Sequence, residues 1–375
     1  MKKFMLDRKL LKELDFSLLI IPVIISLFGS LNIYSATVNN ANLKSSGTHI
    51  FITQLIFLFL SLIFVYLSLL FDYIFISNFS YILYWVGVAL LFYTDIAGNV
   101  TKGAQSWIKI FGITIEPAEI IKIGLILLIA KKISDMDGDV NKFKNLLQIV
   151  IYTAIPVAFI LKEPNYGLAI ICLCIVFGML FISNLHLKII FTVLLIAVLS
   201  CILVWKLNLL KPYQILRITS FLNPSASSSD STLQVDNSIL AIGSGGILGK
   251  GFLHSTQVSG GFIPEAQTDM IFSVVGEEWG LIGAVVLFLL YVILLVRILK
   301  TSIQSKDILG KLICIGYFSA LSFSIFQNIG MTIRLAPVAG ITLPFMSAGG
   351  SSLLTNFIII GLISNVSMRK KKINF

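Results

Sequence analysis

Charged residues, histidine and cysteine are all scarce in this chain. Only 12% of its 375 residues are charged, about half the share that is usual in a soluble globular protein. The three histidines show no ligand spacing, so the sequence indicates no metal site. Because the four cysteines lie in apolar runs without CxxC spacing, they are predicted to be buried thiols rather than disulfides or zinc ligands: Cys172, Cys174, Cys201 and Cys314.

The chain is instead rich in long apolar runs. Hydrophobic residues make up 57% of the chain, and a helix needs about 20 of them to cross a bilayer. Six runs contain no Lys, Arg, Asp or Glu: Phe16–Tyr34, Ile50–Phe71, Ile74–Tyr93, Tyr166–Leu185, Ile189–Trp205 and Leu312–Met331. Four more are shorter or contain charge: Pro117–Ala130, Leu146–Leu161, Met270–Val296 and Leu353–Met368. We therefore predict an all-α polytopic membrane protein with about ten transmembrane helices, in a single domain covering residues 1–375.

The basic residues are distributed unevenly. The chain has 28 Lys and Arg against 18 Asp and Glu, a net charge of +10. Most of the basic residues fall on the side of the predicted bundle that holds both termini, and the positive-inside rule makes that side cytoplasmic. The first run is too long for the apolar part of a signal peptide, so we expect it to be retained as a helix. The positive charge suits anionic lipid and does not indicate a nucleic-acid partner.

A long polar segment, residues 206–269, separates the seventh and eighth predicted helices and is expected on the extracytoplasmic side. Its serine-rich part, Ser225–Ser231, is predicted to be a flexible linker. Its glycine cluster, Gly243–Gly251, is expected to be ordered and half-embedded in the membrane. The cluster is not a P-loop, because Ser244 and Gly251 occupy positions that require Gly and Ser or Thr.

Three other segments combine proline, glycine and charge beside apolar runs. They are Gly103–Lys122, Glu163-Pro164-Asn165, and Arg334–Ser352. Irregular backbone at membrane depth is tolerated only where it is buried in protein or lines a cavity. The sequence therefore predicts a polar cavity near the extracytoplasmic ends of several helices.

Several motifs in order resemble the SEDS family, whose members include RodA, FtsW and SpoVE. They are Ala241–Gly251, Phe262–Asp269, Glu277–Gly280, Asn328–Met331, Leu343–Ser352, Gly103–Trp107 with Glu119 and Lys122, and Tyr213–Pro224. The resemblance covers nearly the whole chain, and Asn328-Ile329-Gly330-Met331 favours the RodA branch. Three departures stand out: Ala348 replaces a Tyr, Arg334 lies in a normally uncharged stretch, and Glu163-Pro164-Asn165 replaces Gln-Pro-Asp.

The resemblance implies a peptidoglycan glycosyltransferase that polymerises lipid II, the undecaprenyl-pyrophosphate-linked disaccharide peptide, for cell-wall elongation, division or sporulation. It also implies a bacterial cytoplasmic membrane location, an extracytoplasmic active site and a class B penicillin-binding protein as partner. This chain has no S-D-N or K-T-G element of its own for cross-linking. The alternatives are a flippase or transporter of lipid-linked precursor, and a non-catalytic scaffold for a penicillin-binding protein.

The resemblance places the catalytic aspartate at Asp269. On local sequence alone, Asp269 suits the N-cap of the following helix equally well. Glu119 and Lys122 share one helical face and either form a simple ion pair or line the cavity, with Lys122 near the pyrophosphate and Glu119 orienting it. Arg217 is a second candidate for the pyrophosphate. Since pyrophosphate leaves without protonation, one base and nearby cations suffice; a divalent cation, Mg²⁺ or Mn²⁺, is an optional addition without an assigned site.

Overall fold

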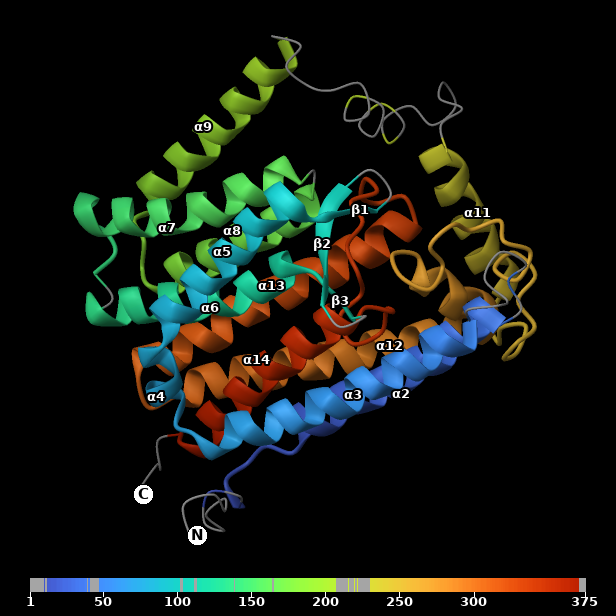
Figure 1. Cartoon of the computed structure of the whole chain (residues 1–375), viewed down its shortest axis with the longest axis horizontal. Helices are drawn as coiled ribbons and strands as arrows, with labels where there is room; N and C mark the ends of the chain where they lie inside the picture. Colours follow the sequence, from blue (N-terminus) through green and yellow to red (C-terminus); the bar gives the residue numbers. More distant parts are fainter. Residues whose placement is uncertain are drawn as a thin grey trace.

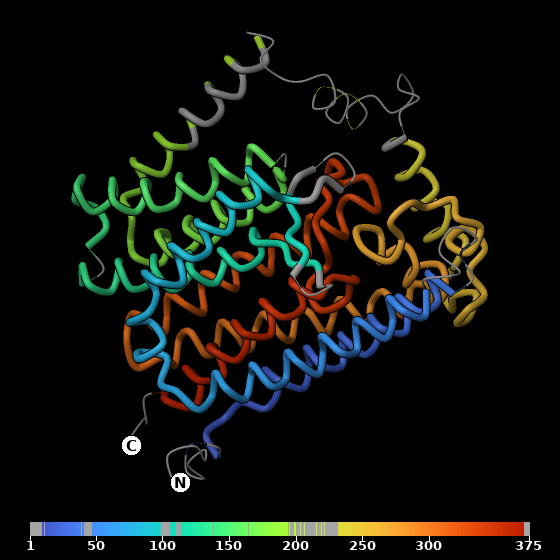
Figure 2. Tube along the Cα trace, in the orientation of Figure 1, coloured from blue at the N-terminus to red at the C-terminus, as the bar shows by residue number. Residues whose placement is uncertain are grey.

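The computed structural model describes residues 10, 12–38, 40, 47–101, 104–110, 113–137, 139–163, 165–206, 215, 219, 221 and 230–370. It is a helical bundle with one small sheet (Figures 1 and 2). The helices are α2 (Ser17–Val38), α3 (Gly47–Leu70), α4 (Tyr73–Asn78), α5 (Ser80–Ala97), α6 (Pro117–Asp135), α7 (Phe143–Lys162), α8 (Tyr166–Ile182), α9 (Leu187–Lys206), α11 (Asp230–Gly245), α12 (Ile271–Gln304), α13 (Ile308–Thr332) and α14 (Gly350–Met368).

Nine of the ten apolar runs coincide with a helix or lie almost wholly within one, and the run Ile74–Tyr93 is divided between α4 and α5. In the described part of the chain, seven helices are long and apolar enough to cross a membrane: α2, α3, α5, α7, α12, α13 and α14. Helix α8 is equally apolar but shorter. A polytopic helical membrane protein is therefore confirmed, whereas the count of ten spans is not.

The most buried helices are α6, α13 and α14, which bury residues on all sides, as expected for helices surrounded by other helices. Helix α14 packs against α3, α6, α2, α13 and α12 (Figure 1). In contrast, α3 and α7 expose large apolar side chains, as a lipid-facing surface requires.

The first and last described helices meet at one end of the bundle. The ammonium of Lys370 lies 4.0 Å from the carboxylate of Glu13, and the guanidinium of Arg369 lies 3.1 Å from Asp72. The described residues that precede α2 and follow α14 therefore lie at the same end of the bundle.

A three-stranded antiparallel sheet corrects the all-α prediction. Its strands are β1 (Asn99–Thr101), β2 (Ala104–Ile110) and β3 (Ile113–Ile115), in the order β1-β2-β3. Ile108 faces Ile115 and Ile110 faces Ile113 across the second pair. These β-branched residues suit a strand, but their apolar alternation is too short to predict a sheet. The sheet leads the chain directly into α6.

Helix α12 is broken at Gly280, whose φ is 62°, and the glycine cluster fills the break. In an unbroken helix the amides of Leu281 and Ile282 would bond to the carbonyls of Glu277 and Glu278. Here they bond instead to the carbonyls of Gly246 and Ile247, at 3.0 and 3.2 Å. The vacated carbonyls of Glu277 and Glu278 accept the amides of Lys250 and Gly251, at 3.0 and 2.9 Å.

The glycine cluster is therefore ordered, as expected, and its role is backbone packing. A side chain at Gly249 would place its Cβ 2.1 Å from the carbonyl oxygen of Glu278. The preceding helix α11 lies inside the segment predicted as a loop, whereas most of the serine-rich stretch lies outside the described residues.

Candidate active site

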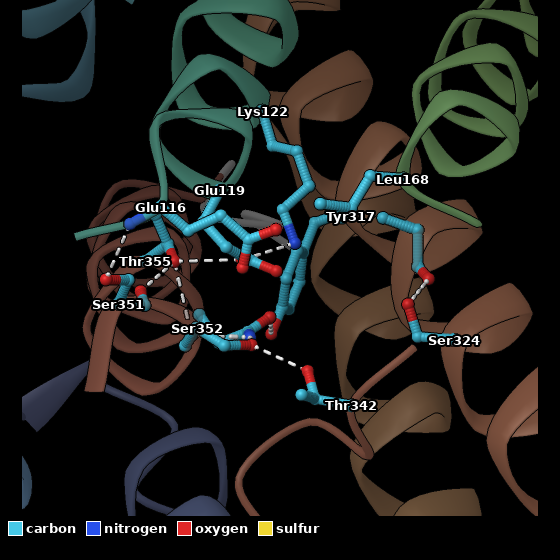
Figure 3. Close-up of polar contacts among 12 residues, drawn as sticks. Glu116, Glu119, Lys122, Leu168, Tyr317, Ser324, Thr342, Ser351, Ser352 and Thr355 are labelled. Atoms are coloured by element: carbon cyan, nitrogen blue, oxygen red, sulfur yellow. Dashed lines mark hydrogen bonds and ion pairs between the residues drawn. The ribbon is translucent and has the colours of Figure 1, made fainter. Parts of the chain in front are cut away.

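Helix α6 carries a buried ion pair. The ammonium of Lys122 lies 2.6 Å from Oε2 of Glu119, and the two residues are only 7% and 4% exposed. Thr355 of α14 also donates to Oε2 of Glu119, at 3.2 Å. Figure 3 shows the two charged side chains turned toward one another between α6, α13 and α14. This contact is expected both for a simple ion pair and for a cavity role, so it does not distinguish the two predictions.

Polar groups of α13 and α14 continue the cluster. Tyr317 donates from its hydroxyl to Oδ1 of Asn356, at 2.9 Å, and Asn356 donates to the carbonyl of Ser352, at 2.7 Å. The hydroxyl of Ser352 is 3.2 Å from that of Thr342, which belongs to the loop between α13 and α14 (Figure 3). A chain of hydrogen-bonding groups thus leads from the surroundings of the ion pair to this loop.

Asp269 lies two residues before the start of α12 and is half-buried. The N-cap of α12 is Met270, which makes no side-chain cap hydrogen bond. Asp269 is therefore one residue outside the capping position, contrary to the N-cap interpretation of the sequence. A Cβ at Gly340 would lie 3.6 Å from Oδ2 of Asp269. Since Gly340 has a φ of 67°, the loop and the carboxylate approach each other closely at a position that favours glycine.

The loop between α13 and α14 also holds the backbone next to Asp269. Ser347 donates to the carbonyl of Thr268 at 2.6 Å, and the amide of Ala348 donates to the carbonyl of Gln267 at 2.9 Å. Ala348, one of the departures from the family pattern, thus contributes through its backbone. The loop therefore contacts both the Asp269 segment and, through Thr342, the cluster around the ion pair.

Two further acids lie at this cluster. Glu116, the residue before α6, accepts a 2.9 Å hydrogen bond from Asn165. Burial, together with the nearby carboxylates of Glu119, Glu163 and Asp269, raises the pKa of Glu116 to about 8, although Lys122 opposes the shift. Glu163 is 3% exposed and accepts a 2.5 Å hydrogen bond from Thr94. Burial raises the pKa of Glu163 to about 7. The sequence singled out both segments without assigning these side chains a role.

The remaining candidates have other positions. Arg217 lies outside the described residues. Arg334 forms an ion pair with Asp236 of α11, which accounts for a charge in a normally uncharged stretch. Glu277 accepts the amides of Thr256, Gln257 and Val258 at 2.8–3.2 Å. It therefore has a structural role, holding the segment that follows the glycine cluster.

Two expectations about metals and thiols concern the described residues. No group of three or more His, Cys, Asp or Glu residues suited to a metal ion occurs among them. Cys172 and Cys314 are buried free thiols, as predicted, whereas Cys174 is a free thiol that is only partly buried. Nothing is established about the fourth cysteine, whose side chain is not described.

The chain matches the FtsW, RodA and SpoVE cell cycle protein model over residues 16–372. It is 33% identical to the probable peptidoglycan glycosyltransferase FtsW of Coxiella burnetii over 325 residues, covering 85% of this chain and 86% of the relative. It is 31% identical to the peptidoglycan glycosyltransferase MrdB of Escherichia coli K12, covering 78% of each. A chain in a solved peptidoglycan synthase complex superposes with a TM-score of 0.80 at 26% identity, covering 94% of this chain and 97% of the other. The chain therefore belongs to the FtsW/RodA/SpoVE family, as its motifs indicate.

Proposed function

We propose that this chain is a peptidoglycan glycosyltransferase that polymerises lipid II into glycan strands. Relatives named as peptidoglycan glycosyltransferases support the reaction class. The observation that carries the proposal is the loop between α13 and α14, which contacts the Asp269 segment at one place and the cluster around the Glu119–Lys122 pair at another. One base and one cation close to each other are what transfer from a diphosphate leaving group requires.

In the proposed reaction, Asp269 is the general base. The 4-hydroxyl of an acceptor sugar attacks the anomeric carbon of the donor sugar, and a new C–O bond forms. The bond from that carbon to the undecaprenyl-diphosphate oxygen breaks, and the leaving diphosphate keeps the electron pair. The hydroxyl proton passes to the carboxylate of Asp269, and Lys122 balances the developing charge on the diphosphate. Glu119 holds Lys122 in place through the 2.6 Å ion pair.

A divalent cation is compatible with this site. Four acidic side chains and one cation, Lys122, influence the charge at the cluster. The acids are Glu116, Glu119, Glu163 and Asp269. A bound Mg²⁺ or Mn²⁺ would supply charge neutralisation to the diphosphate oxygens.

The proposed arrangement has ten spans, both termini in the cytoplasm and the site on the extracytoplasmic side. The ten helices that coincide with the apolar runs and the basic residues near the chain ends support this orientation. A class B penicillin-binding protein is the proposed partner, since a chain of the same fold occurs in a peptidoglycan synthase complex.

The direct test is polymer formation from labelled lipid II by the purified chain, alone and with its co-purified partner. Glycan strands that are longer than the input disaccharide and sensitive to a muramidase are expected. A flippase would move lipid II across vesicles without making polymer. A scaffold would support synthesis only by its partner and would be unaffected by substitution of Asp269. Either pattern would reject the polymerase.

A further inference from the structure

The side chain of Glu116 takes no part in the Glu119–Lys122 ion pair and does not cap its own helix. Glu116 occupies the N-cap of α6, yet it makes no side-chain cap hydrogen bond. The next residue, Pro117, has no amide proton to offer. Glu119 and Lys122 are buried, whereas Glu116 is only half-buried. Among these three ionisable groups at the start of α6, Glu116 is therefore the most accessible.

Asn165 holds Glu116 from a different helix. Nδ2 of Asn165 donates to Oε1 of Glu116 at 2.9 Å, while Oδ1 of Asn165 accepts the amide of Leu168 at 3.3 Å as the N-cap of α8. Both ends of the Asn165 amide are therefore engaged, and its orientation is fixed. On the other side, the backbone amide of Glu116 donates to the hydroxyl of Ser351, in the first turn of α14, at 3.2 Å. Helix α8 thus holds the carboxyl group of Glu116, and α14 holds its backbone.

An aspartate would not serve at position 165. Aspartate caps a helix about as well as asparagine, but it would place a second carboxyl group against that of Glu116. Asn165 is one of the departures from the Gln-Pro-Asp pattern of the family, and its donation to Glu116 gives that departure a physical reason.

We propose that Glu116 is an additional substrate-binding residue, positioned by Asn165, whose second oxygen accepts hydrogen bonds from sugar hydroxyl groups of the lipid-linked substrate. The inference rests on the proposed function, because it takes the substrate from there. Hydroxyl groups are the donors that a saccharide offers, and a carboxyl group keeps acceptor lone pairs in either protonation state. With Oε1 bound to Asn165, the other oxygen is the one available to the substrate.

The orientation of a glutamine at position 116 provides the test. In Glu116→Gln, the amide oxygen accepts from Asn165, so the NH₂ group takes the place of the free oxygen, where an acceptor is needed. We expect Kd for labelled lipid II and KM for polymerisation to rise about tenfold. The value of kcat should change little, because the lost contact already exists in the bound ground state. The melting temperature should stay close to that of the unmodified protein.

Combining Glu116→Gln with Asn165→Asp reverses the donor and the acceptor. The carboxylate introduced at position 165 then accepts from the glutamine NH₂ group, and the glutamine oxygen is left free to accept from the substrate. The double variant should therefore recover most of the affinity that Glu116→Gln loses. Asn165→Asp alone should lower both the melting temperature and the affinity. The matched control is Asn145→Asp, which makes the same chemical change on α7, where Asn145 donates to the carbonyl of Asp139 at 2.7 Å. It should leave Kd and KM unchanged.

Two results would overturn the inference. Unchanged Kd and KM in Glu116→Gln would show that Glu116 only links helices. A double variant that binds as poorly as Glu116→Gln would remove the positioning role of Asn165. An unmodified protein that binds lipid II without polymerising it would reject the proposed reaction, and Kd would still decide the role of Glu116. An unmodified protein that does not bind lipid II would reject both.

Discussion

The side chain of Asn328 holds the backbone of Asp269. Its Nδ2 donates to the carbonyl of Asp269 at 2.8 Å and to the carbonyl of Ile341 at 2.7 Å. Asn328 is completely buried in α13. One side chain therefore fixes the start of α12 and the loop that faces the Asp269 carboxylate, so the placement of the proposed base depends on a residue of another helix.

Replacing Asn328 with alanine should impair both stability and activity. The two carbonyls would lose their shared donor, at a cost of about 2–4 kcal/mol if neither finds water. We expect a melting temperature several degrees lower and at least tenfold slower lipid II polymerisation. Gln327→Ala, which removes a bond to Pro337 from the same helix, should have a smaller effect on activity. Equal activity losses in the two variants would argue against a specific tether on Asp269.

Asp269→Asn should abolish most of the polymerase activity while the protein remains folded. The amide has the size of the carboxyl group but cannot take a proton, and loss of a general base costs about 100- to 10,000-fold in rate. Because Met270 is the N-cap of α12, no large loss of stability is expected. The measurement is lipid II polymerisation at matched amounts of folded protein. Full activity in this variant would exclude Asp269 as the base.

Lys122→Met should also prevent polymerisation, since it removes the cation proposed for the diphosphate. It leaves Glu119 buried without its partner, which costs about 3–5 kcal/mol in a buried pair. The double variant Lys122→Met with Glu119→Gln removes that penalty and should restore the melting temperature. Activity should remain absent in the double variant. Polymer synthesis by the double variant would show that Lys122 and Glu119 have a purely structural role.

The buried carboxyl of Glu163 should make stability depend on pH. Its pKa is raised from 4.5 to about 7, mainly by burial. The folded state therefore holds the proton more tightly than the unfolded state. This contribution is complete below about pH 4.5 and is lost as the pH rises through about 7. The melting temperature should fall between pH 5.5 and 8.5, and Glu163→Gln should reduce that slope. Asp139→Asn, on the surface, is the control; an unchanged slope in Glu163→Gln would contradict the prediction.

The proposed orientation can be tested with single cysteines. After the four native cysteines are replaced by serine, His254→Cys should react with an impermeant thiol reagent in intact cells, because His254 is exposed on the segment expected outside. Ser305→Cys, between α12 and α13, should react only after the cells are opened. The opposite pattern would invert the topology.

The sequence predicted the features that depend on local spacing or on apolar runs. The apolar runs located the ten helices because membrane spans are recognisable from composition and length, and the spacing of Glu119 and Lys122 placed them on one face of α6. The roles of Asn165 and Asn328 could not be predicted, because their partners lie 49 and 59 residues away along the chain. The sheet was missed because β1 and β3 have only three residues each.

The exchange of hydrogen bonds at the break in α12 restricts the number of residues that Gly246–Gly251 can contain. The carbonyls of Gly246 and Ile247 accept the amides of Leu281 and Ile282. The amides of Lys250 and Gly251 then donate to the carbonyls of Glu277 and Glu278. An inserted or deleted residue within Gly246–Gly251 would shift one set of partners relative to the other and leave buried backbone groups unpaired. Natural insertions and deletions are therefore expected to avoid this segment, whereas single substitutions at its exposed positions, such as Leu248, should be tolerated.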